Sequence, residues 1–300
     1  MRCTAQGTGA TATSAKLSVW IISAWIILAV IATSALAQQP TVVPTDHYGP
    51  PKCVAGPRQG HSDALARAHD EQKQALVNSQ IVLSDEPLEN FGVERYKLAE
   101  YGECTGDGGC YWADLDTQYK RAQSELTKAL AAKKPGDKLA VVMDIDETTL
   151  TNYCEMRRED FGLVSPMYQQ WEISPEAATA IPGALRLFNQ ARAAGVAVFF
   201  ITGRMGKPDP RVQFIGPGDA TAATAKNLEA AGFHGWAGLR LRNGDENHMP
   251  TIAYKAQERR KIVADGYRIL MSLGDQWSDL LGDPQADISI KLPNPFYFIP

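Results

Sequence analysis

The sequence has no excess of positive charge and few cysteines, and each shortage excludes a class of protein. Its 300 residues carry 30 basic and 34 acidic side chains, a net charge of −4, so a nucleic-acid-binding scaffold with a basic face is disfavoured. Five cysteines are too few for a small fold built on disulfides. Hydrophobic residues make up 44% and charged residues 21% of the chain. These ordinary proportions exclude disorder, collagen and coiled coil for the bulk of the protein.

Charge is almost absent from the N-terminal segment, where Arg2 and Lys16 are the first two charged side chains. Residues 17–37 form an apolar run that ends in Ala-Leu-Ala, the small-x-small pattern that signal peptidase accepts. We therefore predict that residues 1–37 are a cleaved export signal, that the mature chain begins at Gln38, and that the protein is periplasmic or secreted. The alternative is an uncleaved membrane anchor, because roughly 20 apolar residues can span a bilayer.

Cleavage at this point removes Cys3 and leaves Cys53, Cys104, Cys110 and Cys154. An even number of cysteines in an oxidising compartment predicts two disulfide bonds. The short glycine-rich segment between Cys104 and Cys110 favours a bond between these two, which leaves Cys53–Cys154 as the second pair. A zinc site is the alternative, but the sequence has no Cys-x-x-Cys and no nearby histidine pair to support it.

The rest of the chain divides into a lead-in and a region of alternating strands and helices. Residues 38–136 are expected to be extended at first and then helical, with helices over 61–79 and 111–133. From residue 137 onward, buried apolar runs alternate with helical patterns, which predicts an α/β fold with a parallel sheet and flanking helices. The expected strands cover 139–145, 196–202, 235–242, 267–275 and 286–292, and the expected helices cover 182–194, 220–231 and 254–265.

Two aspartates follow the first expected strand, Asp144 and Asp146. Ligands bind to open α/β sheets at the carboxyl ends of the strands, and residues two apart on an extended chain point the same way. Two adjacent carboxylates require a cation or a shared proton. The pair therefore suits a magnesium site in which one carboxylate attacks phosphorus and the other moves the proton. A strand exit with Asp146 as a helix cap is the structural alternative.

Three more groups of polar residues lie close to strand ends. Thr202, Gly203 and Arg204 follow the second strand, where a hydroxyl, a glycine amide and a guanidinium can hold phosphate oxygens. Lys255 can neutralise a transferring phosphoryl group. Each also has an ordinary explanation, a tight turn in the first case and a solvated lysine in the second.

The last group is Asp275 and Asp279. Four residues apart at the start of a helix, their carboxylates share a side and can bind or orient a divalent cation. Acidic residues that complement the dipole at a helix N-terminus are the alternative.

Taken together, the four groups resemble the haloacid dehalogenase superfamily, whose motifs are D-x-D, S/T, K and an acidic pair. The strings DIDETTLTN, FFITGR, YKAQERRKI, GDQWSDLLGD and LPNPFYFIP are similar to acid phosphatases related to plant vegetative storage proteins and bacterial surface acid phosphatases. The resemblance is close over 138–300 and loose over the helical lead-in. It implies a haloacid dehalogenase-like catalytic domain over 137–300, with a small cover element at about 152–180.

The resemblance also implies roles for individual residues. Asp144 would be the nucleophile and Asp146 the general acid and base, with Lys255 balancing phosphate charge. Thr202, Gly203 and Arg204 would bind the substrate phosphate.

Magnesium would bind the Asp144 carboxylate, the Asp146 carbonyl and Asp275. Asp279 would be either a further ligand or an acid that orients Lys255 or a water molecule.

The implied substrate is a small phosphomonoester, such as a nucleotide, sugar or aryl phosphate, and no nucleic-acid polymer. The cover carries four aromatic residues that either stack on the leaving group or pack the cover against the sheet: Tyr153, Phe161, Tyr168 and Trp171.

A storage or surface-binding protein of low activity is the alternative function, although the intact Asp144 argues against it. A transferase or a dehalogenase that uses the same aspartate is a third alternative, of which the dehalogenase is disfavoured by the acidic GDQWSD segment because it needs no magnesium. The sequence indicates no oligomeric state.

Overall fold

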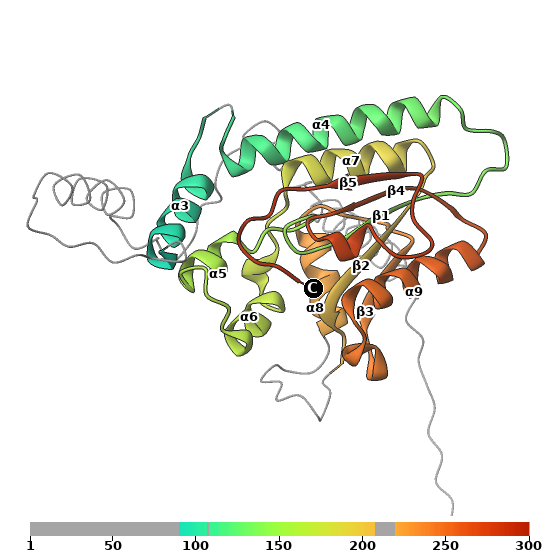
Figure 1. Ribbon diagram of the computed structural model, residues 1–300. Helices are drawn as coiled ribbons and strands as arrows, with labels where there is room; N and C mark the ends of the chain where they lie inside the picture. The colour runs from blue at the N-terminus through green and yellow to red at the C-terminus, as the bar shows by residue number, and fades with distance from the viewer. Residues whose placement is uncertain (1–89, 107, 208–219, 300) are drawn as a thin grey trace, which may run out of the picture. The chain divides into compact units, whose positions relative to one another are not determined.

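The computed structural model of the chain describes residues 90–106, 108–207 and 220–299 (Figure 1). The predicted export signal and the predicted helix over 61–79 lie outside these residues. No helix in the described part of the chain is long and apolar enough to cross a membrane.

Five parallel strands form the sheet, in the order β3-β2-β1-β4-β5. All five match expected strands, and the predicted α/β fold with a parallel sheet is confirmed. Their bounds are β1 Leu139–Met143, β2 Ala197–Met205, β3 Gly238–Arg242, β4 Arg268–Gly274 and β5 Ile288–Lys291. The central strand β1 is buried at every position, as expected of a parallel strand covered on both faces.

Successive residues of β2 point to opposite faces of the sheet and so build two cores. Phe199 packs in a cluster with Tyr254 and Ile262 of helix α9, Thr251–Ala264. Phe200 stacks instead on Phe188 of helix α7, Pro182–Ala193, with ring centroids 6.0 Å apart. The sheet is therefore held between α9 on one face and α7 on the other (Figure 1).

The remaining helices surround this core. They are α3 Phe91–Glu103, α4 Tyr111–Leu130, α5 Tyr153–Arg158, α6 Ser165–Glu172 and α8 Ala220–Ala230. The long helix α4 was expected from the sequence and lies alongside α7 (Figure 1). An ion pair of 2.9 Å between Arg186 and Asp116 joins the two helices.

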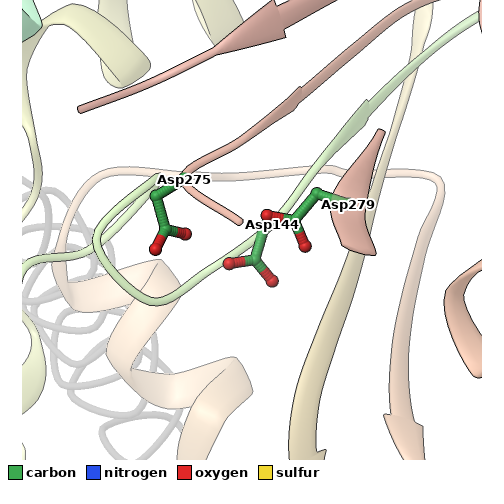
Figure 2. Close-up of side chains that lie close together, drawn as sticks. All are labelled: Asp144, Asp275 and Asp279. Carbon is green, nitrogen blue, oxygen red and sulfur yellow. The ribbon is translucent and has the colours of Figure 1, made fainter. Parts of the chain in front are cut away.

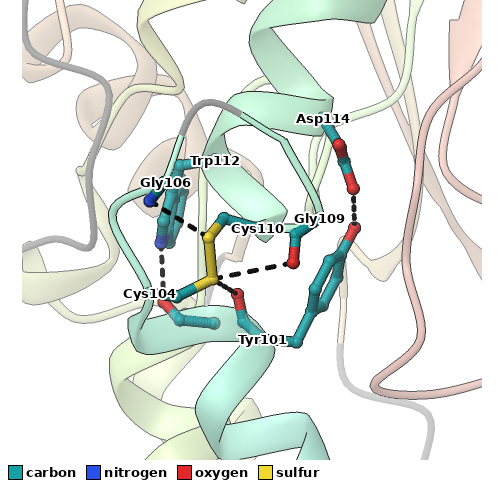
Figure 3. The surroundings of a disulfide bond; sticks show 8 residues. Tyr101, Cys104, Gly106, Gly109, Cys110, Trp112 and Asp114 are labelled. Carbon is teal, nitrogen blue, oxygen red and sulfur yellow. Dashed lines mark hydrogen bonds between the residues drawn. A yellow bond between two sulfur atoms is a disulfide. The ribbon is translucent and has the colours of Figure 1, made fainter.

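A disulfide bond between Cys104 and Cys110 closes the turn between α3 and α4 (Figure 3), as predicted. Two hydrogen bonds brace the same turn: Trp112 donates to the carbonyl of Gly102 at 2.8 Å, and the Tyr101 hydroxyl donates to Asp114 at 2.7 Å. Cys154 is also disulfide-bonded, but its predicted partner, Cys53, lies outside the described residues.

Candidate active site

Three aspartates from two neighbouring strands meet at the carboxyl edge of the sheet (Figure 2). Asp144 follows β1, whereas Asp275 follows β4 and Asp279 ends the short 3₁₀ helix Trp277–Asp279. One carboxylate oxygen of each lies within 4.8 Å of the others, and all three residues are buried. Strands β1 and β4 are hydrogen-bonded neighbours, which is why residues far apart in the sequence converge here.

Lys255 of α9 points its ammonium into this cluster. It donates to Asp144 Oδ1 at 2.6 Å and also to Asp279 Oδ1. Although burial alone lowers the pKa of Lys255, the charges of Asp144 and Asp279 raise it above its ordinary value. The ammonium therefore stays protonated, and the alternative of a solvated lysine does not describe this side chain.

One ammonium does not balance three carboxylates. Burial and the charges of Asp279 and Asp275 raise the pKa of Asp144 well above its ordinary value, against the opposing effect of Lys255. Burial, followed by the charge of Asp279, likewise raises the pKa of Asp275. The cluster thus has a buried excess of negative charge on hard oxygen atoms, and this donor set fits a divalent cation such as Mg²⁺.

The two outer aspartates are held differently. Asp275 accepts hydrogen bonds of 2.7 Å from the side chains of Gln276 and Asn294. Asp279 uses one oxygen for Lys255 and the other for the backbone N–H of Gln276, at 2.8 Å. Asp279 is therefore already engaged in orienting Lys255.

Asp146 lies beside this cluster and accepts hydrogen bonds from three side chains. Arg204 donates to it from Nη2 at 2.6 Å and from Nε at 3.1 Å, Asn152 donates at 2.7 Å and Thr202 at 3.2 Å. Burial alone raises the pKa of Asp146, but the charge and hydrogen bonds of Arg204 and the bond from Asn152 lower it below its ordinary value. The structural alternative, in which Asp146 caps a helix, does not describe this side chain, because its carboxylate accepts from Arg204, Asn152 and Thr202 instead.

The predicted phosphate-binding residues lie in β2 itself, which extends through Met205 and does not turn at Thr202. Gly203 and Arg204 line the pocket described below. The remaining Nη1 of Arg204 donates to the Glu172 carbonyl at 2.9 Å. Arg204 therefore binds Asp146 and the cover element, in addition to facing the pocket.

A pocket of about 430 Å³ opens over Asp144 and Asp146. One part of its wall comes from the segment 156–173 and another from the C-terminal residues 296–299. Its aromatic lining consists of Phe161, Tyr168, Phe296, Tyr297 and Phe298. A cavity of this size with an aromatic wall and a few convergent charged groups is typical of a site for a small organic ligand.

The family model for "HAD superfamily, subfamily IIIB (Acid phosphatase)" matches residues 67–300. The chain belongs to this acid phosphatase family. The resemblance noted in the sequence motifs is thereby confirmed, and the parallel sheet is that of the haloacid dehalogenase fold.

Among curated relatives, the tomato (Solanum lycopersicum) protein "Acid phosphatase 1" is 34% identical over 161 residues, 53% of this chain and 58% of that protein. "Vegetative storage protein 1" of Arabidopsis thaliana is 30% identical over 195 residues, 63% of this chain and 66% of that protein. The aligned segment thus spans somewhat over half the length of the relatives it matches.

Two solved structures of the class C acid phosphatase of Bacillus anthracis are also similar to this chain. The first has a TM-score of 0.45 at 22% identity and covers 62% of this chain and 80% of that chain. The second, with tungstate bound, has a TM-score of 0.49 at 21% identity and covers 68% and 85%.

The aromatic residues of the cover differ in position, so that some can contact a leaving group in the pocket and others pack the cover. Tyr168 and Phe161 line the pocket, and Trp171 does not. The indole N–H of Trp171 donates instead to Asn152 Oδ1 at 3.0 Å. Tyr153 packs edge-to-face on Trp112, with ring centroids 5.6 Å apart, so its role is structural.

Sequence reasoning assigned no role to several residues of this site, namely Glu147, Asn152, Gln276, Asn294 and Tyr297. Glu147 is fully buried and accepts from the Tyr297 hydroxyl at 3.2 Å and from the Asn152 backbone N–H at 2.5 Å. It adopts a φ of 51°, an unusual conformation for a residue other than glycine. All five residues lie in the strings that carried the family resemblance, and that was the available signal.

Proposed function

We propose that the protein is an exported, magnesium-dependent acid phosphatase that hydrolyses small phosphomonoesters through an aspartyl-phosphate on Asp144. The observation that carries this proposal is the buried contact between Asp144 and Lys255 at 2.6 Å beside the carboxylates of Asp275 and Asp279. Such an arrangement supports a nucleophile in a site whose excess negative charge a cation would compensate.

In the first step, a carboxylate oxygen of Asp144 attacks phosphorus and the bond from phosphorus to the ester oxygen breaks. Asp146, in its protonated form, gives its proton to the departing alkoxide, which leaves as an alcohol; because, against the effect of burial, Arg204 lowers the pKa of Asp146, acid pH favours this form. Asp144 and Asp146 both line the same pocket, which supports the assignment of the nucleophile to one and the proton donor to the other.

In the second step, a water molecule attacks phosphorus and gives a proton to Asp146. The bond between Asp144 and phosphorus breaks, and inorganic phosphate leaves. Lys255 balances the charge of the phosphate oxygens. The backbone N–H of Gly203 binds these oxygens, together with Thr202 and Arg204 on either side of it. Phosphoryl transfer depends mainly on positioning and charge neutralisation, and this set of residues supplies both.

Asp144 and Asp275, with the backbone carbonyl of Asp146, would hold the magnesium ion, which would neutralise charge on the phosphoryl oxygens when bound. Asp279 would orient Lys255, because its two oxygens are already engaged by Lys255 and the Gln276 backbone.

The likeness to vegetative storage proteins favours a second candidate, a storage or surface-binding protein of low activity on the same scaffold. Hydrolysis of 4-nitrophenyl phosphate by residues 38–300 separates the two. We expect turnover that a chelator abolishes and Mg²⁺ restores. Turnover no faster than that of the Asp144→Asn variant would favour the storage protein.

A further inference from the structure

Trp171 is a cover residue whose polar atom faces the catalytic edge of the sheet, although its ring does not line the pocket. Its indole N–H donates to Asn152 Oδ1 at 3.0 Å, and Asn152 Nδ2 donates to Asp146 Oδ1 at 2.7 Å. These two hydrogen bonds form a continuous connection from helix α6 to the carboxylate that we propose as the proton donor.

The Asn152 side-chain amide can make both hydrogen bonds in only one orientation. An indole nitrogen can donate but cannot accept, so the amide oxygen of Asn152 must face Trp171. The amide nitrogen then necessarily faces Asp146. With the opposite orientation, the amide nitrogen would meet the indole N–H and the amide oxygen would meet a carboxylate. Asn152 is fully buried, so water does not offer its amide an alternative partner at low cost.

A second connection ties the same carboxylate to the end of the same helix. Arg204 donates from Nη2 to Asp146 at 2.6 Å and from Nη1 to the carbonyl of Glu172 at 2.9 Å. Asn227 also donates to this carbonyl, at 3.2 Å. Two adjacent residues of α6, Trp171 and Glu172, are thus joined to Asp146 by different routes.

We infer that Trp171 and Asn152 are positioning residues that fix the Asp146 carboxylate in the direction needed for proton transfer to the leaving group. The inference rests on the proposed function, because it assigns Asp146 the proton. Trp171 orients the Asn152 amide, the amide orients Asp146, and α6 carries Trp171. The cover therefore both encloses the substrate, through Tyr168, and places the proton donor.

This role has a signature that a merely structural tryptophan does not have. Proton transfer matters most for alcohols that leave poorly as alkoxides, and least for a leaving group as good as 4-nitrophenolate. A displaced proton donor therefore slows the hydrolysis of an alkyl phosphate more than that of an aryl phosphate. A general loss of structure slows both equally.

The test is Trp171→Phe, which keeps an aromatic ring and removes the N–H. We expect kcat/KM to fall about tenfold for an alkyl phosphate such as glycerol 3-phosphate and less than about twofold for 4-nitrophenyl phosphate. The expected loss is smaller than the contribution of a positioned proton donor, about 10²–10⁴-fold, because Asp146 remains and loses only part of its orientation. Trp236→Phe is the matched control, because Trp236 packs on Phe200 and does not line the pocket. It should change neither value.

A second variant keeps the inference testable if the first folds poorly. Asn152→Ala should show the same dependence on the leaving group, although it also removes a hydrogen bond of 3.2 Å to Glu147. Adding Trp171→Phe should cause little further loss, because Trp171 acts through the Asn152 amide. Equal losses for the two substrates, no loss for either, or additive losses would overturn the inference. If the wild-type protein hydrolyses neither substrate, the proposed function itself is wrong, which is a different result from these.

Discussion

The buried ammonium of Lys255 offers a direct physical test of the site, through the substitution Lys255→Met. Lys255 contacts Asp144 and Asp279, and their three side chains are 2–6% exposed. Methionine keeps most of the volume and removes the positive charge, so that Asp144, Asp275 and Asp279 remain together without a compensating cation. Breaking a buried ion pair in this way costs about 3–5 kcal/mol.

For a folded region of this size, each kcal/mol lowers the melting temperature by about 2–4 °C, so we expect a decrease of about 10 °C in a chelating buffer. The assay is thermal unfolding followed by circular dichroism, with chelator and with Mg²⁺. Magnesium should reduce the difference between variant and wild type, because it compensates the same carboxylates.

Lys261→Met on the same helix is the matched control. This lysine is 49% exposed and pairs with Glu246 and Glu258, and exposed ion pairs are worth about 0–1 kcal/mol. If Lys255→Met melts within about 2 °C of Lys261→Met in chelator, the charge balance derived for this site is wrong.

Three further predictions concern the cover, the pH dependence and the processed chain. Tyr168→Ala should weaken the hydrolysis of aryl and nucleotide phosphates far more than that of small alkyl phosphates; equal losses would show that the ring is structural. Burial and the charge of Asp146, opposed by Arg204, raise the pKa of Glu172 from 4.5 to about 8. The uncharged carboxyl of Glu172 therefore contributes stability that is full below pH 4.5 and is lost as the pH rises through about 8. Urea unfolding at pH 5 and pH 8 should therefore show a decline in the free energy of unfolding of the wild type, and this decline should be smaller by about 3 kcal/mol in Glu172→Gln. N-terminal sequencing of exported protein should begin at Gln38, and thiol titration of the denatured, unreduced protein should find no free thiol; a retained leader or reactive thiols would contradict this.

The sheet was predictable because its strands are short apolar runs that end at polar residues. Residues 139–143 and 197–201 are hydrophobic almost throughout, which indicates strands covered on both faces. The end of β2 was less predictable, because Thr202, Gly203 and Arg204 are typical of a turn, yet they continue the strand. Helix α3 was not expected, and its weakly amphipathic sequence FGVERYKLAEYGE explains the omission.

The catalytic acids were predictable because they lie within a few residues of strand ends. Their partners were not, because a hydrogen bond such as that from Asn152 to Asp146 depends on a side-chain direction that sequence spacing does not determine. Contacts between distant segments were also hidden. Asn294 donates to Asp275, and Tyr297 donates to Glu147, 150 residues away. These contacts form because β5 pairs with β4 at the edge of the sheet and the segment after β5 reaches the residues that follow β4 and β1.

The central claim, that Asp144 carries the phosphoryl group, is tested most directly by acid-quench labelling with a substrate that carries labelled phosphate. Asp144→Asn should take up no label and should show only background turnover. Asp146→Asn should still be labelled by an aryl phosphate, and the label should accumulate because the residue that activates water is missing. Normal labelling of Asp144→Asn, or label on a different residue, would contradict the mechanism.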